Sequence, residues 1–572
     1  MAVENLITEH IDIWTSAEKT RSTSGRGSSK KLELYGVKKL RELILELAVR
    51  GKLVPQNPND EPASVLLERI AAEKAQLVKE KKIKKQTALP EVTEQEAPFN
   101  VPKGWEWTRL GNLSSDIHYG YTASAKPNSE GVRLLRITDI QNDKVNWETV
   151  PACDITEEKA KSYLLENDDI LIARTGGTIG KSYLVENIDL QAVFASYLIR
   201  VKRVQAVYAP FTKVFLGSQL YWKQLIENSA GTGQPNVNAT ALKQLLFIVP
   251  PFNQQKRIVA KVDELMTLCD QLEQQTEASI EAHQVLVTNL LNTLTNSADA
   301  DELMQNWARI SEHFDTLFTT EESIDQLKQT ILQLAVMGKL VPQNPDDEPA
   351  AELLKRIAEE KALPPIAEDE KPFELPSGWE WCRGDEIADF IDPQPSHRTP
   401  PKVEGGVPYI GYTDIDHNSG IDFNNARKVG GNVLEEHRER YTLRVGDFVF
   451  GKIGTLGKPF FLPKPFDYCL SANLILIQPK NEHVTPKFLA LYLNSPTLYQ
   501  VLGEQKTNST HGVFGIKKAR LLPIPLPPIQ EQDLIVAKIE ELETICEQLK
   551  MRLIDSHTTK VELTDTIVEQ AV

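Results

Sequence analysis

A stretch of 35 residues occurs twice in this chain, and this repetition constrains the fold more than any other feature. Residues 40–74 read LRELILELAVRGKLVPQNPNDEPASVLLERIAAEK, and residues 327–361 read LKQTILQLAVMGKLVPQNPDDEPAAELLKRIAEEK. The two stretches are identical at 25 of 35 aligned positions. A long internal repeat indicates that one structural unit is built twice. The 572 residues are therefore predicted to form two copies of one plan.

Other segments recur in the same order around this stretch. The matching pairs are 7–12 with 310–315, 98–107 (PFNVPKGWEW) with 372–381 (PFELPSGWEW), and 250–272 with 527–549. Each copy thus runs through a helical block, a Trp-Glu-Trp segment, a variable globular part, a Pro-Pro exit and a second helix. The first copy also has about sixteen extra residues, including RSTSGRGSSKK at 21–31. That insert is rich in Gly, Ser and basic residues and is predicted to be a mobile loop.

The helical blocks show one-sided apolar spacing. Apolar residues at i, i+3, i+4, i+7 and i+8 mark the first helix: Leu40, Leu43, Ile44, Leu47 and Ala48. Gly51 is predicted to end this helix, and the prolines at 55 and 58 prevent its continuation. A second helix is predicted from Glu61-Pro62 into the basic run 79–86 (KEKKIKKQ), which is either a solvated helix end or a phosphate contact.

Two longer helices follow the Pro-Pro exits. Their apolar seams, spaced 4-3-4-3, comprise Ile258, Val262, Leu265, Cys269 and Leu272 in one, and Ile535, Ile539, Leu542, Cys546, Leu549 and Leu553 in the other. An amphipathic helix needs a partner. Helix 253–295 is followed by helix 322–337, whereas the C-terminal helix has no partner next to it in sequence. We therefore expect the C-terminal helix to pack against the N-terminal block.

The globular parts are predicted to be mixed and strand-rich. In the first, strands are expected at 133–137, 170–173, 182–185, 197–201 and 245–249, with a helix over 210–228. The fold class is therefore α+β, with two mixed α/β domains separated by two long antiparallel, coiled-coil-like helical spacers in a pseudo-twofold cyclic arrangement. The expected boundaries are 1–97 (N-terminal helical block), 98–250 (first domain), 251–371 (central spacer), 372–528 (second domain) and 529–572 (C-terminal helix).

Net charge and cysteine content constrain the binding partners and the cellular location that the protein can have. The net charge is −16, but residues 98–250 hold 16 basic and 15 acidic residues, and residues 372–528 hold 17 of each. The acidity therefore lies in the helical blocks, where it either solvates the helices or binds a protein partner. The five cysteines have no metal-ligand spacing, and no long apolar run predicts a membrane span. A reducing, cytoplasmic location is expected.

Two glycine-rich loops resemble phosphate-binding loops without matching them. Residues 170–181 read ILIARTGGTIGK, but Thr175 stands where the P-loop pattern needs its first glycine. The equivalent loop at 448–459 reads FVFGKIGTLGKP, and Pro459 replaces the hydroxyl residue that would hold Mg²⁺. A strand–turn–strand hairpin with glycines at positive φ is the structural alternative. The functional alternative keeps this hairpin and lets Arg174, Lys181, Lys452 and Lys458 face DNA.

No catalytic constellation is found in the sequence. The Pro-Pro segments at 250–251 and 527–528 lack the Asn or Asp that precedes them in amino-methyltransferases, and no glycine-rich adenosylmethionine loop lies upstream. They are interpreted as domain exits. No Ser/His/Asp arrangement, HExxH motif or acidic nuclease cluster is present. The chain is therefore expected to be non-catalytic, without a cofactor or metal.

Two loops differ most between the copies, at 230–238 (AGTGQPNVN) and 504–515 (EQKTNSTHGVFG). Their amide, hydroxyl and imidazole groups can read base edges, although ordinary surface loops have the same composition. The DNA-contacting candidates in these loops are Thr232, Gln234, Asn236, Lys506, Asn508 and His511. Further candidates are Tyr119, Lys126, Arg133 and Arg136 in the first domain, and His397, Arg398 and Tyr412 in the second. The Trp residues of the two GWEW segments, at 105, 107, 379 and 381, are expected to pack in the core or at a hinge and not to stack on bases.

The ordered combination of these segments resembles the specificity subunit of type I restriction–modification enzymes. The resemblance rests on the LAVRGKLVPQNPNDEPA and LAVMGKLVPQNPDDEPA blocks, the GWEW segments, the two TDI segments (138–140 and 413–415), the GTGQPN loop and the P-P-x-x-x-Q-x-x-I-V-A-K exits. It covers nearly the whole chain. It implies that each globular domain is a target-recognition domain for one half of a split double-stranded DNA site. It also implies that two methyltransferase subunits dock on the helices and that two endonuclease subunits complete the enzyme.

A second function class fits the same repeats. A tandem scaffold that holds two copies of a protein partner, without DNA, would also need duplicated helices with acidic surfaces. Salt-dependent DNA binding by the partner complex distinguishes the two hypotheses, because phosphate contacts release counterions.

Overall fold

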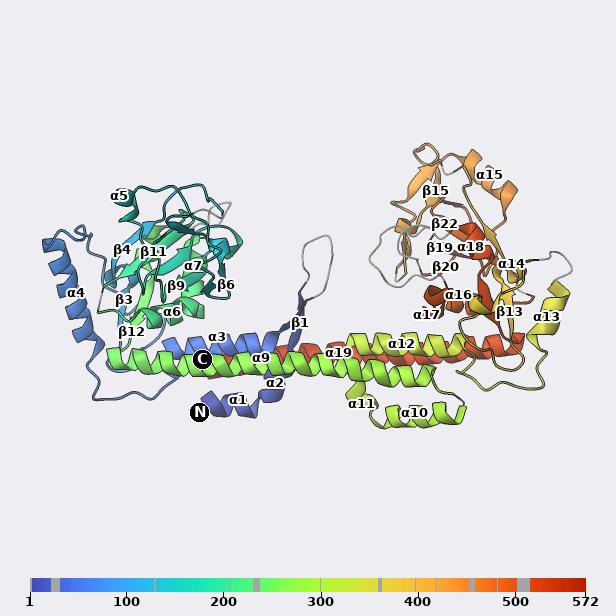
Figure 1. Cartoon of the computed structure of the whole chain (residues 1–572), viewed down its shortest axis with the longest axis horizontal. Helices are drawn as coiled ribbons and strands as arrows, with labels where there is room; N and C mark the ends of the chain where they lie inside the picture. Colours follow the sequence, from blue (N-terminus) through green and yellow to red (C-terminus); the bar gives the residue numbers. More distant parts are fainter. Residues whose placement is uncertain are drawn as a thin grey trace. The chain divides into compact units, whose positions relative to one another are not determined.

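The computed structural model describes residues 3–21, 31–127, 130–204, 206–229, 237–298, 300–357, 363–396, 398–417, 419–451, 458–480, 482–501 and 515–572. The chain divides into two compact units (Figure 1). Unit 1 comprises residues 1–279 and 556–572, and unit 2 comprises residues 280–555. Each unit contains a globular mixed domain and parts of long helices. Within the described part of the chain, every helix is too short or too polar to cross a lipid bilayer.

Unit 1 begins with short helices and a β-ribbon, followed by the first globular domain. Its helices are α1 (Val3–Glu9), α2 (Ile11–Ser16), α3 (Tyr35–Val49), α4 (Ala63–Lys79), α5 (Glu157–Ala160), α6 (Ala209–Gly217), α7 (Gln219–Ser229), α8 (Ala239–Gln244) and the first part of α9 (Phe252–Thr295). Its strands are β1 (Glu18–Arg21), β2 (Lys31–Leu34), β3 (Glu106–Arg109), β4 (Ser114–Tyr119), β5 (Arg133–Leu135), β6 (Ile140–Gln141), β7 (Lys144–Val145), β8 (Ile170–Ala173), β9 (Ser182–Leu184), β10 (Ala192–Phe194), β11 (Leu198–Arg203) and β12 (Leu246–Val249).

Unit 2 repeats this order. Its helices are α10 (Ala300–Glu312), α11 (Phe314–Leu317), α12 (Glu321–Val336), α13 (Ala350–Ile357), α14 (Gly384–Ile387), α15 (Gly431–Arg440), α16 (Pro486–Leu493), α17 (Pro496–Val501), α18 (Ile516–Arg520) and the first part of α19 (Ile529–Ala571). Its strands are β13 (Glu380–Arg383), β14 (Ala388–Ile391), β15 (Val407–Ile410), β16 (Ile415–Asp416), β17 (Gly420–Ile421), β18 (Arg427–Val429), β19 (Phe448–Gly451), β20 (Phe460–Phe461), β21 (Cys469–Leu470), β22 (Leu474–Pro479) and β23 (Pro523–Leu526).

The two globular domains share one strand topology. Unit 1 has an antiparallel four-stranded sheet in the order β4-β11-β8-β9, and unit 2 has the order β14-β22-β19-β20. A second, two-stranded sheet joins the start and the end of each domain, β3 with β12 and β13 with β23. A parallel pair, β5 with β10 and β15 with β21, completes the common plan. The α+β prediction and the duplication are confirmed.

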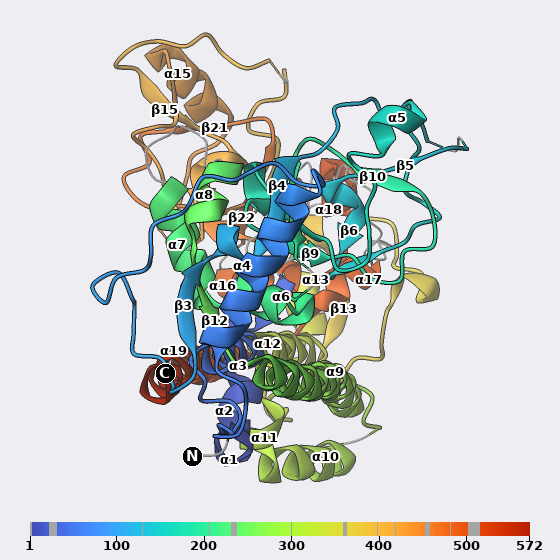
Figure 2. The same ribbon diagram turned by 90° about the vertical axis from the view of Figure 1, so that its left-hand side faces the viewer.

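The helical base of unit 1 joins both ends of the chain. The Arg41 guanidinium on α3 donates to Asp270 (2.7 Å) and Glu273 (2.6 Å) on α9. The Tyr35 hydroxyl on the same helix donates to Asp565 on α19 (2.7 Å). Figure 2 shows α4 crossing the front of this unit, where its apolar side chains pack on α6 and β12. The N-terminal block therefore has the C-terminal helix as its partner, as the repeat predicts.

The base of unit 2 is assembled in the same way. Apolar residues of α9, α12 and α19 form one cluster, with Leu291, Leu327 and Ile535 all at least 97% buried. Two ion pairs tie α12 to α19, Lys328 with Glu547 and Lys550 with Asp325, each at 2.5 Å. The predicted seams are buried at Ile258, Val262, Leu265 and Cys269, and at Ile535, Ile539 and Cys546.

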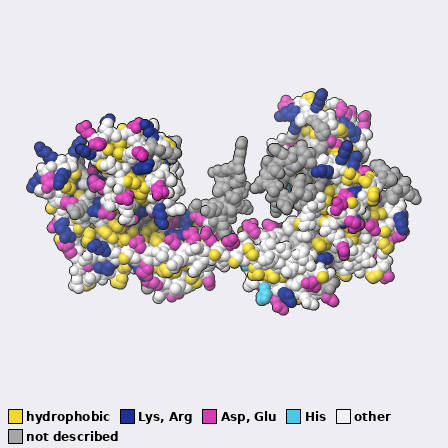
Figure 3. Space-filling view, viewed as in Figure 1, with side chains coloured by type: hydrophobic (Ala, Val, Ile, Leu, Met, Phe, Trp, Pro, Cys, Tyr) yellow, Lys and Arg dark blue, Asp and Glu magenta, His cyan; other side chains and the backbone are white. Residues whose placement is uncertain are grey.

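Acidic side chains lie in a row along the helices of unit 1 (Figure 3).

A left-handed glycine joins each helical block to its domain. Gly51 (φ +69°) and Gly338 (φ +71°) follow the helices α3 and α12. The backbone amide of the residue after each glycine donates to a carbonyl in the last turn of the helix, for example Lys52 N–H to Leu47 O (2.9 Å). A Cβ atom on Gly338 would lie 2.4 Å from Pro376 and 3.0 Å from Trp379. Trp379 and its counterpart Trp105 are buried. The predicted helix end and the core position of Trp105 and Trp379 are confirmed, whereas Trp107 and Trp381 are only partly buried.

We expect Gly338→Ala to destabilise unit 2. The left-handed conformation alone costs an L-residue about 1–2 kcal/mol, and the contact with the Pro376 ring adds to it. The midpoint of urea unfolding should fall accordingly. Gly431→Ala is the matched control, because its Cβ would meet open space and its φ is ordinary. Equal midpoints for the two variants would contradict this role of Gly338.

Arg383 anchors the start of the second domain. Its guanidinium donates to both carboxylate oxygens of Glu370 (2.8 Å each) and to the carbonyls of Pro364, Pro365 and Leu521. Arg109 makes the equivalent contacts to Glu96, Pro90 and Gln244 in unit 1. The Arg383 hydrogen bonds lower the pKa of Glu370 to about 2. Each domain is therefore tied to the segment that precedes it.

Glu370→Gln tests the pH dependence of this anchor. Because the folded pKa lies below the unfolded value, the carboxylate stabilises the fold above about pH 4.5, and this contribution is lost as pH falls toward 2. With the carboxylate 40% exposed, we expect a loss of only about 1 kcal/mol at pH 7. The gap between the unfolding midpoints of variant and wild type should close between pH 4.5 and 2. A gap that persists at low pH would contradict the ion-pair explanation.

Three local predictions were wrong or incomplete. The helix α4 ends at Lys79 instead of continuing through the basic run, and Lys81 adopts φ +55°. The predicted helix 210–228 is two helices, α6 and α7, which meet at Ser218. In the predicted loop 21–31, the end residues belong to the antiparallel strands β1 and β2, whereas residues 22–30 lie outside the described part of the chain.

Candidate nucleic-acid interface

The first glycine-rich loop is a hairpin. Strands β8 and β9 pair in antiparallel register, and Gly176 (φ +75°) and Gly180 (φ +81°) form the turn between them. A Cβ atom on Gly180 would lie 2.2 Å from Leu225, and the Gly180 carbonyl accepts from the Tyr221 hydroxyl (2.8 Å). A P-loop leads from a strand into a helix, whereas this loop leads into a strand. The strand–turn–strand prediction is confirmed.

Three elements of the first domain meet beside this hairpin. The Arg174 guanidinium, directly after β8, lies over the ring of Tyr119 at the end of β4, 4.8 Å from its centroid. The Tyr119 hydroxyl accepts from the amide of Ala239 at the start of α8 (3.2 Å), and the Arg174 carbonyl accepts from the amide of Val237 (3.0 Å). The predicted contacts Thr232, Gln234 and Asn236 lie outside the described residues. Arg174 and Tyr119 thus form a cationic and aromatic surface group.

The other predicted cations of this domain differ in their availability. The Lys126 ammonium pairs with Asp154 (2.5 Å), and Arg136 forms a two-point ion pair with Asp139 (2.7 and 3.0 Å). The Arg133 guanidinium donates to the carbonyl of Val150 (3.2 Å). Lys181, in the hairpin, is exposed and has no carboxylate partner among the described residues. Lys181 is therefore the predicted cation of this domain that is best placed to meet phosphate.

The two TDI segments have a structural role. Asp139 and Asp414 each accept from the backbone amide three residues earlier, at Arg136 (2.8 Å) and Gly411 (2.7 Å). These bonds close short 3₁₀ turns at Ile137–Asp139 and Tyr412–Asp414. The candidate Tyr412 packs against the apolar cluster of the second domain, with its ring centroid 6.5 Å from that of His417. The TDI residues thus shape the backbone beside the sheet.

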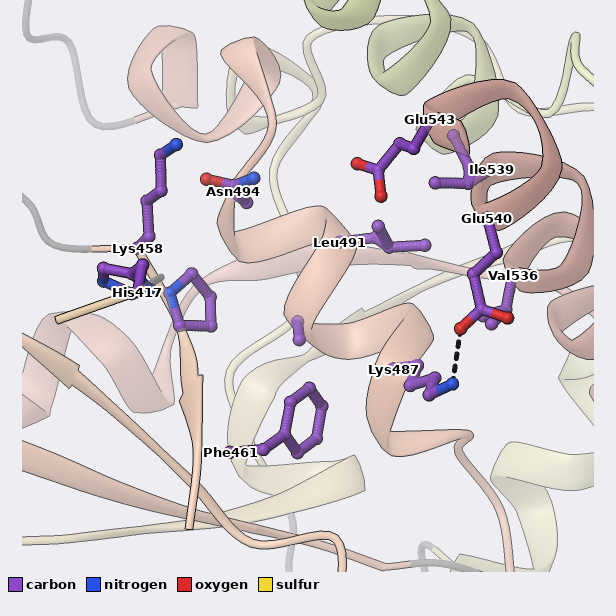
Figure 4. A pocket seen from close by; sticks show the side chains of 12 residues that line it. His417, Lys458, Phe461, Lys487, Leu491, Asn494, Val536, Ile539, Glu540 and Glu543 are labelled. Atoms are coloured by element: carbon purple, nitrogen blue, oxygen red, sulfur yellow. Dashed lines mark hydrogen bonds and ion pairs between the residues drawn. The ribbon is translucent and has the colours of Figure 1, made fainter. Parts of the chain in front are cut away.

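In unit 2 the equivalent hairpin is formed by β19 and β20. The predicted contacts His397, Lys452, Lys506, Asn508 and His511 lie outside the described residues. Lys458 and Arg398 are described, and both are exposed. Figure 4 shows Lys458 and His417 at one end of a cavity of about 260 Å³, and the Lys487–Glu540 ion pair at the other. Burial lowers the pKa of His417, and the nearby Lys458 adds to this effect.

One of the positions that line this cavity carries a very different side chain in unit 1. Ala490 lines the cavity, and Lys213 holds the equivalent position in unit 1. The Lys213 ammonium donates to the Ser182 carbonyl (2.6 Å) and pairs with Asp143 (2.9 Å). The hydrogen-bonded Lys213 side chain therefore supports the first hairpin. The methyl group of Ala490 occupies the equivalent position beside the second hairpin.

Sequence reasoning missed Tyr197. It was assigned to a strand, but β11 begins only at Leu198 and the Tyr197 side chain is 63% exposed. Its carbonyl accepts from the amide of Arg174 (3.1 Å), so the Tyr197 backbone lies beside the group formed by Arg174 and Tyr119. Ser196 and Tyr197 form the turn between β10 and β11, and this turn exposes the Tyr197 side chain directly before the buried Leu198. An exposed aromatic side chain beside cations is typical of nucleic-acid surfaces.

The cysteines and the Pro-Pro segments have structural roles. All five cysteines are buried, and burial raises the pKa of the Cys269 thiol to about 11. Among the described residues, no three His, Cys, Asp or Glu side chains group as metal ligands. The Pro-Pro segments lead directly into α9 and α19, where the carbonyls of Pro250 and Pro527 accept from Gln255 and Gln532. Each Pro-Pro segment thus lies between the last strand of a globular domain and a long helix.

Comparison with known proteins gives consistent results. The sequence model of the type I restriction modification DNA specificity domain matches residues 102–282 and again 376–556. The EcoAI and EcoEI specificity subunits of type I restriction enzymes from Escherichia coli are 39% and 38% identical, and each alignment covers 100% of both chains. The solved HsdS subunit from Thermoanaerobacter tengcongensis is 19% identical with a TM-score of 0.42, covering 83% of this chain and 98% of that one. The sequence relatives favour DNA specificity over a scaffold without DNA.

Proposed function

Because this chain belongs to the specificity subunits of type I restriction enzymes, we propose that each of its globular domains reads one half of a bipartite double-stranded DNA site. One observation carries the proposal: the domains share a strand order and a set of anchoring contacts, yet differ in the loops and cations around their hairpins. A common framework with different exposed side chains is what two readers of different sequences require.

In this proposal the two parts of each surface have separate tasks. Lys181 and Lys458, at equivalent places on the two hairpins, contact phosphate and position the domain on the duplex. Arg174, Tyr119 and Tyr197 lie where a loop meets the hairpin in unit 1, and they contribute to base discrimination. Phosphate contacts give affinity that falls with salt, whereas base contacts give sequence preference.

The helices supply the rest of the assembly. We place one methyltransferase subunit on each copy of the helical repeat, so that two are bound, and two endonuclease subunits join the complete cytoplasmic enzyme. Methyl transfer and cleavage are the work of these partners, and the present chain needs no cofactor or metal. The lengths of α9 and α19, 44 and 43 residues, determine the gap between the two halves of the site.

A salt titration of DNA binding tests the phosphate assignment. We expect Lys181→Gln, in complex with the cognate methyltransferase, to weaken binding to all sequences alike. The slope of log affinity against log salt should become shallower by about 0.9, the value for one lost phosphate contact. Lys126→Gln is the control, since its ammonium is already paired with Asp154. An unchanged slope for Lys181→Gln would remove this residue from the interface, and binding without salt dependence would contradict the proposed function.

A further inference from the structure

A segment of the second domain between β14 and β15 carries Arg398, and side-chain hydrogen bonds hold its backbone at several residues. The Arg440 guanidinium donates to the Pro393 carbonyl (3.2 Å), and Arg427 donates to the Pro400 carbonyl (2.8 and 3.1 Å). Between these points the Gln394 side-chain amide donates to the Ser396 hydroxyl (2.9 Å) and the Arg398 carbonyl (3.4 Å). The Arg398 side chain itself is exposed. An exposed cation therefore sits on a segment held at several backbone positions.

A buried histidine, His437, forms a hydrogen bond with the Gln394 side chain. The His437 side chain, on α15, is 1% exposed, and its Nε2 lies 2.7 Å from Gln394 Oε1. Its Nδ1 lies 2.8 Å from the Tyr441 hydroxyl. Because the Gln394 amide nitrogen donates toward the segment, its oxygen must accept, so His437 carries its proton on Nε2 and accepts from Tyr441 at Nδ1. The hydrogen bonds thus run in one direction, from Tyr441 through His437 and Gln394 to the backbone at Arg398.

The surroundings keep this histidine neutral. Burial lowers the pKa of His437 to about 4, and the nearby Arg440 contributes. A neutral imidazole with one donor and one acceptor matches the two partners, so both ring nitrogens are satisfied. A buried, fully satisfied polar group of this kind specifies one conformation of the residues that it bonds.

The first domain has no equivalent arrangement among its described residues. There the segment after β4 is held by backbone bridges, Tyr121 with Ala195 and Lys126 with Ala152. The short α5, of four residues, stands where unit 2 has the ten-residue α15 that carries His437. The His437–Gln394 pair is thus a feature of one domain and not of the shared framework.

We infer that His437 and Gln394 are positioning residues that hold Arg398 against a base edge in the half-site read by the second domain. This inference rests on the proposed function. The Arg398 guanidinium donates hydrogen bonds to the base, most favourably to the O6 and N7 atoms of guanine. The hydrogen-bonded segment holds the Arg398 backbone in place in the absence of DNA, so less conformational entropy is lost on binding. A contact to phosphate would lower affinity for all sequences equally, whereas a base contact makes the loss depend on sequence.

The test uses the full chain in complex with its methyltransferase and two duplex libraries, each with one half-site randomised. The sequences in the bound fraction give the preference at every base pair. We expect Gln394→Glu, which still accepts from His437 but cannot donate to Ser396 or to the Arg398 carbonyl, to lose ~10-fold or more of the preference at one or two base pairs. The affected positions should be those lost in Arg398→Ala, and the other half-site should be unchanged. His437→Gln, which retains a donor, should keep more of the preference than His437→Leu.

Two further variants make the outcome decisive. Arg438→Gln is the matched control, because Arg438 is the neighbour of His437 on α15 and pairs only with Asp467 among the contacts described (2.9 Å). Ser396→Ala breaks the same hydrogen bond at an exposed position if Gln394→Glu fails to fold. Retention of the wild-type preference by both Gln394→Glu and Ser396→Ala would overturn the inference, as would a uniform loss across all sequences. A wild-type complex without preference in this half-site would instead refute the proposed function.

Discussion

Exchanging residues 98–250 for the corresponding part of another specificity subunit should replace one half of the methylated DNA site and leave the other half unchanged. Both strands of the joining sheet, β3 and β12, lie within the exchanged part, so the new domain carries its own framework. Each wrong base pair costs about 1–3 kcal/mol, so three of them reduce affinity by roughly two to six orders of magnitude. Methylation of the original site should therefore disappear.

The reciprocal exchange supplies the control for this experiment. Replacing residues 372–528 should change only the half that the first exchange leaves intact, because Arg383 and β13 anchor the second domain independently. Modified-base sequencing reads both results directly. A change in both halves, or in neither, would contradict the assignment of one half-site to each domain.

Replacing Leu268 and Ile545 together by aspartate should abolish stable binding of the methyltransferase. These residues hold equivalent positions of the repeat, on α9 and α19, and their side chains are 46% and 43% exposed beside the buried Cys269 and Cys546. In the proposed assembly two identical partners meet equivalent residues, so repeated exposed apolar positions are the natural contacts. A charge buried in each interface should cost at least about 2 kcal/mol per site, or roughly 30-fold in affinity.

Met551→Asp is the control for the docking experiment. Met551 lies on the same helix and is 62% exposed, but Gln274 holds its position in the other copy. Size-exclusion chromatography of the mixed subunits should show the complex for Met551→Asp and free subunits for the double variant. Each single variant should lose one of the two partners. A complex of normal size formed by the double variant would exclude these residues from the interface.

Much of the scaffold could be predicted because its signals are local or repeated. The apolar seams, the ends of α3 and α12 at Gly51 and Gly338, and the β8–β9 hairpin depend on residue spacing and on positive φ at glycine. The partner of α19 followed from the repeat alone. These features need no knowledge of distant contacts, and the structure contains each of them.

The errors arose where distant contacts override local propensity. The basic run after Lys79 is helical by composition, but the Lys74 ammonium donates to Gly111 and Gln86, and the Gln86 amide donates to Ser115. These bonds turn the chain back onto β4, and burial lowers the pKa of Lys74 to about 8. The helix therefore ends where docking to the domain begins.

The candidate site was less predictable than the scaffold for the same reason. A cationic residue in a sequence does not reveal whether a carboxylate lies beside it. The sequence therefore does not distinguish Lys126 and Arg136, which form ion pairs, from Lys181. The exposed ring of Tyr197 depends on a turn, and the link between His437 and Gln394 spans 43 residues. Pairings over such separations leave no local pattern.

In the proposed function this chain selects the DNA sequence that its methyltransferase modifies. The most direct measurement is a modified-base map of genomic DNA from cells that express the methyltransferase with and without this chain. We expect a split, asymmetric motif to be modified only when this chain is present. If the methyltransferase copurifies with the chain but no motif appears, the chain holds its partner without directing it to DNA, and the proposed function is contradicted.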